Sequence, residues 1–176
     1  DIVSMENVSG LADTEKYPVF KEFIDTLDRN HYKYNYEIVD TSDYGVPQRR
    51  ERLVLLASRF GEIALIAKTH KNKKVTVRDV IARLPPLKHG AIHPKDPLHR
   101  ASRLDPINLK RIMATPRDGG NSASWSEELQ LKCHKKKSGR TYKGTVYGRM
   151  RWDEPAPTMT TQCVGIGNGR FGHPVQ

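Results

Sequence analysis

The stretch DYGVPQRRERLVLLASR, residues 43–59, decides the fold because it joins a tight turn to a fully apolar strand. Gly45 and Pro47 favour the turn, and the apolar run within residues 52–58 predicts a buried strand. Three arginines lie between the two features, at Arg49, Arg50 and Arg52. Charged groups at the mouth of a buried strand lose solvation unless a polar or anionic group meets them. The stretch therefore predicts a core strand and a binding role for its arginines.

Strand and helix patterns alternate on the N-terminal side of this stretch. DIVSMENV, residues 1–8, predicts a buried strand with polar residues at its carboxyl end. Apolar residues at helical spacing predict a helix capped by Thr14 and ending near Asn30. YNYEIVD, residues 34–40, predicts a second strand, and its short connection to residues 52–58 predicts an antiparallel pair. The order strand, helix, strand, hairpin, strand indicates an α/β fold.

The character of the sequence changes after Lys68, and we predict a domain boundary near residue 70. A short helix is predicted from Val77 to the prolines at 85 and 86, and another in DPINLKRIMA, residues 105–114. Pro, Gly, Lys and His are frequent in residues 89–145, which favours loops with little core of their own. Residues 147–174 predict a short strand, a Thr-rich strand and a Gly-rich loop.

The charge balance favours a polyanionic partner. The 176 residues include 30 Lys and Arg against 20 Asp and Glu, with a formal net charge of +10. Because no basic amphipathic helix stands out, nucleic acid is a better candidate than a membrane surface. A basic protein without such a partner has the same composition, so charge alone leaves that alternative open. The scattered histidines and the two distant cysteines, Cys133 and Cys163, indicate neither a metal site nor a disulfide framework.

Three motifs carry a resemblance to the C5-cytosine DNA methyltransferases. They are ENV at residues 6–8, YGVPQRRER at residues 44–52, and RMRWDEPAPTMTT at residues 149–161 with HP following at His173. They resemble the sixth, eighth and ninth motifs of that family, with its variable target-recognition region between the last two. The long motif at residues 44–52 is the specific signal, whereas ENV and PTMTT alone are weak.

The resemblance implies a division of the chain and a fold for each part. Residues 1–69 are expected to form the end of a Rossmann-like methyltransferase sheet in the catalytic α/β domain. Residues 70–176 are expected to form a small, loop-rich target-recognition domain and the start of the return to the catalytic domain.

The family's chemistry gives the motif residues their implied roles. Cytosine C5 is a poor nucleophile, so these enzymes first add a thiolate to C6, which requires a proton donor at N3. By resemblance, Glu6 is this donor, with its carboxyl shielded by the flipped base, and Asn7 fixes a neighbouring loop. Arg52 is implied to reach the cytosine O2. Arg50 and Gln48 are implied to support the flipped nucleotide. An exposed strand-end glutamate and a hairpin with solvated charges are the structural alternatives.

The target base must leave the duplex, because C6 and N3 are inaccessible inside the base stack. We therefore expect cationic and hydroxyl side chains to hold the DNA backbone. The predicted DNA-binding residues are Arg49, Lys135, Lys136, Lys137, Arg140, Arg149, Arg151, Thr158 and Thr160. A solvated loop is the alternative for each lysine, and Trp152 is predicted to be core rather than a stacking platform.

Two family features are missing from the sequence. The nucleophile of the family sits in a Pro-Cys dipeptide, and this chain contains none. The glycine-rich loop for S-adenosylmethionine is also missing, because GIGNGRFG at residues 165–172 does not lie between a first strand and its helix. The resemblance thus implies part of a DNA (cytosine-5)-methyltransferase, inactive alone, whose S-adenosylmethionine is bound mainly by parts absent from this chain.

Partners and setting follow from the same resemblance. We expect duplex DNA as the partner, no membrane, and a monomer when complete, in the bacterial cytoplasm or nucleoid within a restriction–modification system. The chain is expected to be an excerpt of a longer protein, or one half of a split methyltransferase partnered by the N-terminal half. Two other functions stay open: a non-catalytic, sequence-specific DNA-binding module, and an RNA-directed member of the same family.

Overall fold

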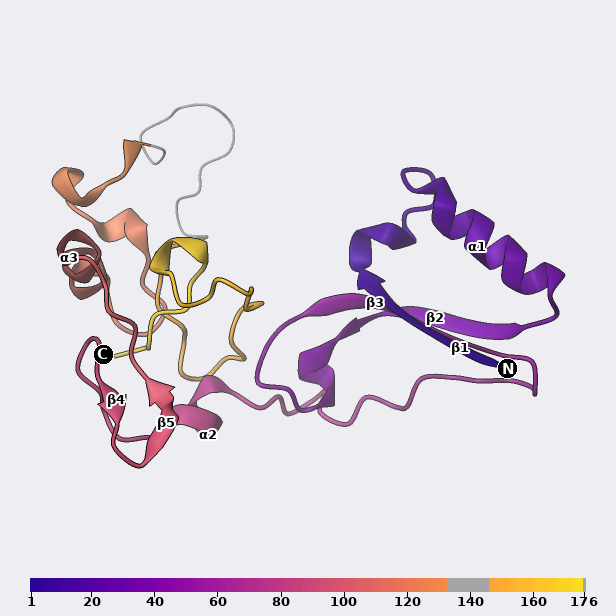
Figure 1. Ribbon diagram of the computed structural model, residues 1–176, viewed down its shortest axis with the longest axis horizontal. Coiled ribbons are helices and arrows are strands. Elements are labelled where there is room, and N and C mark those ends of the chain that lie inside the picture. Colours follow the sequence, from indigo (N-terminus) through magenta and orange to yellow (C-terminus); the bar gives the residue numbers. More distant parts are fainter. Residues whose placement is uncertain (133–145, 176) are drawn as a thin grey trace. The chain divides into compact units, whose positions relative to one another are not determined.

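The computed structural model divides the chain into two compact units, Asp1–Lys74 and Val75–Gln176 (Figure 1). The structure describes residues 1–132 and 146–175. The fold is mixed α/β, and the sheets within these described residues are antiparallel.

The first unit is built on a three-stranded sheet. Its strands are β1 (Ile2–Val8), β2 (Lys33–Asp40) and β3 (Glu51–Ser58), in the order β1-β3-β2. The central strand β3 runs antiparallel to both neighbours, so β1 and β2 run parallel to each other. The antiparallel pairing of β2 with β3 confirms the prediction from their short connection.

Helix α1 (Pro18–Arg29) covers one face of this sheet (Figure 1). The predicted cap at Thr14 was wrong, because the helix begins four residues later, at Pro18, with Tyr17 as its N-cap. Proline suits a first helical position, since its fixed φ matches the helix and its missing N–H would have no partner there. The helix ends as predicted, with Asn30 as its C-cap.

The core of the first unit lies between α1 and the sheet. Phe20 and Leu27 of the helix pack against Leu53, Leu55 and Ala57 of β3, and all five are buried. Because side chains alternate along a strand, the residues between these on β3 project from the other face. The alternation of side chains along β3 therefore assigns one face to packing against α1 and leaves the other to the candidate site.

The second unit contains shorter elements. They are α2 (Val77–Ile81), β4 (Ile92–His93), β5 (Asp96–Arg100) and α3 (Pro106–Ala114). Helix α2 begins at Val77 as predicted, after a capping box formed by Thr76 and Asp79, but it ends at Ile81, before the prolines at 85 and 86. Helix α3 lies where the sequence predicted it. Short 3-10 helices across both units cover Ser9–Ala12, Thr41–Tyr44, Ser122–Ser124, Glu127–Leu129 and Ile166–Asn168.

Strand predictions failed in the second unit. The hairpin of β4 and β5 was not predicted, because its strands are short and carry polar residues and Pro97 rather than an alternating apolar pattern. The predicted Thr-rich strand is wrong, since residues 157–160 have no regular structure. Pro155 and Pro157 lack the N–H groups that a ladder needs, which explains the absence. An isolated bridge joins Arg149 to Gly172.

None of the helices within residues 1–132 and 146–175 has both the length and the apolar character needed to cross a membrane.

Candidate functional site

Glu6 and Arg52 meet on the sheet face that α1 leaves uncovered. Glu6 lies opposite Val54 in the β1–β3 ladder, and Arg52 lies opposite Val8. Both side chains therefore project from the same face of the sheet, as diagonal neighbours on adjacent strands. Arg52 Nε lies 2.8 Å from Glu6 Oε1, and Arg52 Nη1 donates to the Glu51 carbonyl at 2.7 Å. The Glu6 side chain is 60% exposed and that of Arg52 21%. An accessible carboxylate is thus held beside an arginine that is itself tied to the backbone.

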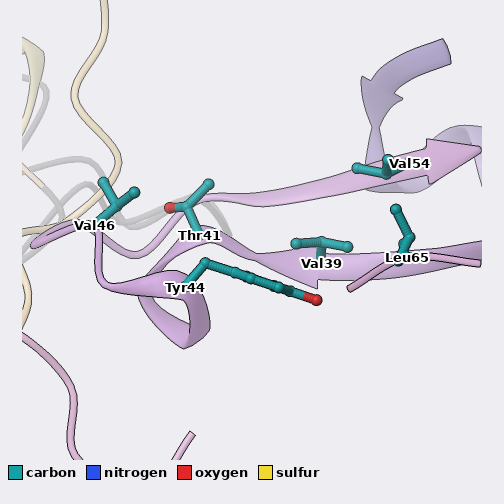
Figure 2. Close-up of a pocket in the computed structure, with 6 residues that line it drawn as sticks. All are labelled: Val39, Thr41, Tyr44, Val46, Val54 and Leu65. Atoms are coloured by element: carbon teal, nitrogen blue, oxygen red, sulfur yellow. The ribbon is translucent and has the colours of Figure 1, made fainter. Parts of the chain in front are cut away.

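An open apolar depression of about 250 Å³ adjoins this pair (Figure 2). Its lining residues are Val39, Thr41, Tyr44, Val46, Val54 and Leu65. Figure 2 shows Leu65 reaching between Val39 and Val54, with the Tyr44 ring extending alongside. Because Val54 lies directly opposite Glu6 on the same face, the ion pair borders the depression. The face therefore combines one charged pair with an apolar floor.

The turn that carries the arginine motif is fixed by hydrogen bonds to Asp40 and Thr41. Asp40 Oδ1 accepts from the backbone N–H of Ser42 at 2.9 Å and of Arg50 at 3.3 Å. Thr41 Oγ1 donates to the Gln48 carbonyl at 2.8 Å. Although burial raises the pKa of Asp40, these hydrogen bonds outweigh it and lower that pKa below its usual value. The backbone of the motif at Gln48 and Arg50 is therefore held in place.

A polar cluster that sequence reasoning missed lies behind this turn. Lys74 Nζ donates to Asp43 Oδ1 at 2.6 Å and to Ser42 Oγ at 2.8 Å, while Lys68 Nζ lies 3.1 Å from Asp43 Oδ2. Hydrogen bonds from Lys74 and Lys68 lower the pKa of Asp43. No local pattern in the sequence links Lys74 to a turn some thirty residues earlier.

The other predicted site residues of the first unit lie at the turn or on the opposite face of the sheet from the Glu6–Arg52 pair. Gln48 and Arg50 are half-buried beside the turn, and Arg49 is exposed. Asn7 lies opposite Leu53, on the face that α1 covers, and its Oδ1 accepts from the Val8 N–H at 2.8 Å. The structure therefore does not bring Asn7 to the Glu6–Arg52 pair, and its predicted role in holding a loop stays a prediction.

Arg149 lies in the interior of the second unit, which corrects its assignment to DNA. Its residue exposure is 3%, and its guanidinium donates to three backbone carbonyls. Nε donates to Thr115 at 3.1 Å, Nη1 to His173 at 2.7 Å and Nη2 to Ile112 at 2.8 Å. Two of these carbonyls belong to the C-terminal end of α3, where helical carbonyls lack intrahelical partners and a cation is favoured. Burial lowers the pKa of Arg149, as expected for an enclosed guanidinium. Arg149 thus stabilises the packing of this unit.

The other predicted DNA contacts of the ninth motif lie at the surface. Arg151, Thr158 and Thr160 are exposed, and Arg151 Nε lies 3.6 Å from Glu154 Oε1. Their contacts with DNA stay a prediction. Trp152 is half-buried, with its ring 5.2 Å from that of His173, which agrees with a packing role. The predicted DNA contacts at Lys135, Lys136, Lys137 and Arg140 lie outside the described residues.

The described residues do not fit S-adenosylmethionine or a metal ion. The connection from β1 to α1, residues 9–17, contains a single glycine, Gly10, where a nucleoside cofactor needs a close backbone approach. The depression beside Val54 is apolar and open. Across the described part of the chain, no group of three or more His, Cys, Asp or Glu side chains could hold a metal ion. We assign no cofactor contact to these residues.

Comparison with known proteins identifies the family. A sequence model of the C-5 cytosine-specific DNA methylases matches residues 1–173. The chain belongs to this family. The predicted resemblance is confirmed, and the match includes the β1 strand end, the arginine motif and the carboxyl-terminal motif.

Individual relatives are type II modification enzymes. Methylase M.HgiDII of Herpetosiphon aurantiacus is 50% identical over 177 residues, which cover 100% of this chain and 49% of that protein. Methyltransferase M1.HgaI of Avibacterium volantium is 31% identical, over 98% of this chain and 48% of that protein. The chain thus spans about half the length of these curated relatives.

A solved structure shares the fold. It is described as a DNA modification methyltransferase encoded within a prophage (E. coli) and superimposes with a TM-score of 0.55 at 18% identity. The match covers 89% of this chain and 52% of that one. This likeness supports the mixed α/β fold.

Proposed function

We propose that the chain is part of a DNA (cytosine-5)-methyltransferase that acts on duplex DNA in a type II modification system. Membership in the C-5 cytosine-specific DNA methylase family and the type II relatives support the reaction and the substrate. S-adenosylmethionine is the proposed methyl donor, bound by residues other than those described here. The first unit is the proposed end of the Rossmann-like catalytic sheet, and the second the proposed target-recognition domain.

The Glu6–Arg52 pair is the observation that carries this proposal. The sheet places the ENV motif and the arginine motif side by side, with Glu6 Oε1 and Arg52 Nε 2.8 Å apart. Addition of a nucleophile to cytosine C6 increases electron density at N3 and O2, which are joined through C2. A carboxyl group and a guanidinium held as neighbours match these two ring positions.

Each member of the pair has a distinct proposed role. Glu6 donates a proton to N3 of the flipped base. Arg52 engages Glu6 through Nε and the Glu51 carbonyl through Nη1, which leaves its Nη2 group as the proposed donor to O2 of the base. The target cytosine reaches this exposed face only after it leaves the duplex.

The decisive experiment replaces Glu6 in the complete protein. Glu6→Gln removes the acidic proton and keeps the side-chain shape, so labelled methyl transfer to duplex DNA should fall by about 10²-fold or more while DNA affinity survives. Glu37→Gln is the matched control, because Glu37 lies opposite Val54 on the same face, on the other side of β3. Near-normal turnover by Glu6→Gln, or equal losses in the two variants, would contradict the role of Glu6. Methyl transfer to tRNA in place of DNA would redirect the substrate to RNA.

A further inference from the structure

The cluster around Lys74 reaches the arginine motif through a shared carboxylate. Lys74 Nζ contacts Asp43 Oδ1 at 2.6 Å, Ser42 Oγ at 2.8 Å and Asp40 Oδ2 at 3.8 Å. Two of the three N–H donors of this ammonium have acceptors in Asp43 and Ser42, and Asp40 lies at ion-pair distance. Ser42 is fully buried and Asp43 is 8% exposed, so solvent does not replace these contacts easily. Lys74 is therefore held by partners from one short turn.

The two aspartates would repel each other without the lysines. Asp40 and Asp43 flank Ser42 on the same turn, and both have lowered pKa values, so both are charged near neutral pH. Lys68 contacts Asp43 at 3.1 Å, whereas Lys74 reaches both carboxylates. Without the Lys74 charge, the two carboxylates would repel each other in a partly buried environment. This repulsion would move Asp40 and Asp43 apart and distort the turn.

Asp40 transmits this effect to the proposed site. Its Oδ2 faces Lys74, while its Oδ1 accepts the Arg50 N–H at 3.3 Å. Asp40 is also the ladder partner of Glu51, whose carbonyl fixes the Arg52 guanidinium. A shift of Asp40 therefore moves the start of β3, and with it the side chain that pairs with Glu6.

Residues 68–74 contact the turn at further points. The His70 N–H donates to the Asp43 carbonyl at 2.7 Å. The His70 ring lies so close to Gly45 that a Cβ on that glycine would come within 2.8 Å of it. Lys74 is also the last residue of the first unit, so the side chain that holds the turn stands where the chain leaves this unit.

We propose that Lys74 is a positioning residue, with Asp43 as its anchor, for the arginines of the YGVPQRRER motif in methyl transfer. This inference rests on the proposed function. A polar cluster suits such a role because its directional hydrogen bonds favour one conformation of the turn. Apolar packing would also stabilise the turn, but it would not select that conformation. Lys74 touches no reacting atom and acts through Asp40 and the start of β3.

The experiment uses the full-length methyltransferase and steady-state kinetics with labelled methyl donor. Lys74→Met keeps the length of the side chain without its charge, and kcat should fall about 10-fold to 100-fold because the arginines lose alignment. KM for duplex DNA and the DNA dissociation constant should stay within about twofold of wild type, since no DNA contact is removed. Lys74→Arg should recover most of kcat, because it restores a cation with several donors.

Controls separate positioning from stability. Lys73→Met changes the exposed neighbouring lysine and should leave kcat unchanged. Asp43→Asn is a second, isosteric variant of the cluster and should lower kcat in the same way as Lys74→Met. Wild-type kcat in Lys74→Met, a matching rise in KM, or failure of Arg to restore kcat would overturn the proposal. Loss of folding in both Lys74→Met and Asp43→Asn would assign the cluster to stability alone and also overturn it.

The same assay distinguishes this proposal from the proposed function. An active wild-type enzyme, an inactive Glu6→Gln and a fully active Lys74→Met would reject only the positioning role. An inactive wild-type enzyme on DNA, or an active Glu6→Gln, would reject the proposed function of the site and the positioning inference that depends on it.

Discussion

Replacement of Arg149 by lysine distinguishes a structural arginine from a DNA contact. The wild-type guanidinium donates to the backbone carbonyls of Ile112, Thr115 and His173 from three different nitrogens. A lysine has one nitrogen on a flexible stem, which cannot reach three carbonyls spread over a planar fork. We expect Arg149→Lys to retain one of the three hydrogen bonds and to destabilise the second unit.

The expected loss can be worked out from these contacts. A hydrogen bond to a charged group contributes about 1.5–3 kcal/mol, so the loss of two corresponds to about 3–6 kcal/mol in the free energy of unfolding. With a urea m-value of about 2 kcal/mol/M, the unfolding midpoint should fall by at least about 1.5 M. This is a large effect for a substitution that conserves charge.

Tryptophan fluorescence reports this unfolding directly. The two tryptophans of the sequence, Trp125 and Trp152, both belong to the second unit. Trp125 Nε1 donates to the Thr115 hydroxyl at 2.9 Å, and the carbonyl of the same threonine accepts from Arg149. Urea unfolding followed at these tryptophans therefore measures the region in which the hydrogen bonds are lost.

Arg151→Lys is the matched control, because Arg151 is exposed and carries the same charge two residues away. Its effect on the free energy of unfolding should stay within about 0.5 kcal/mol. An unchanged urea midpoint for Arg149→Lys together with weaker DNA binding would refute the structural role and restore the DNA contact.

Two further predictions concern pH and backbone conformation. Burial lowers the pKa of His173 below its ordinary value of 6.5, so the unfolded chain binds a proton that the folded unit disfavours. The resulting contribution to the free energy of unfolding is fully present above about pH 6.5 and is lost as the pH falls through the lowered pKa. His173→Gln should remove this pH dependence from unfolding followed by tryptophan fluorescence. Gly45 has a φ of +86°, and a Cβ at this position would lie 2.8 Å from the His70 ring. Gly45→Ala should therefore lower the free energy of unfolding of the first unit by about 1–3 kcal/mol, as measured by circular dichroism. Gly10→Ala, at a glycine without a positive φ and with the nearest atom 4.0 Å from the added Cβ, should cost less, and equal losses would contradict this reasoning.

Local patterns in the sequence determined the elements of the first unit and the family. The apolar run of β3 and the helical spacing of α1 are encoded by neighbouring residues, because burial of one face sets the period of the pattern. The antiparallel pairing of β2 and β3 follows from a connection too short for a crossover. The YGVPQRRER motif at residues 44–52 indicated the methyltransferases because its nine residues are consecutive in the sequence and can be recognised without the fold.

The tertiary structure decided which side chains meet. Glu6 and Arg52 are neighbours because β3 lies between β1 and β2, and strand order depends on long-range pairing that no local pattern specifies. The same holds for Lys74 and Asp43, which lie far apart in the sequence and close in space. Arg149 has the charge of a DNA contact, yet the C-terminal end of α3 and the chain near His173 enclose it. Charge is a property of the residue, whereas burial is a property of the fold, and burial decides whether an arginine faces a ligand or the protein's own carbonyls.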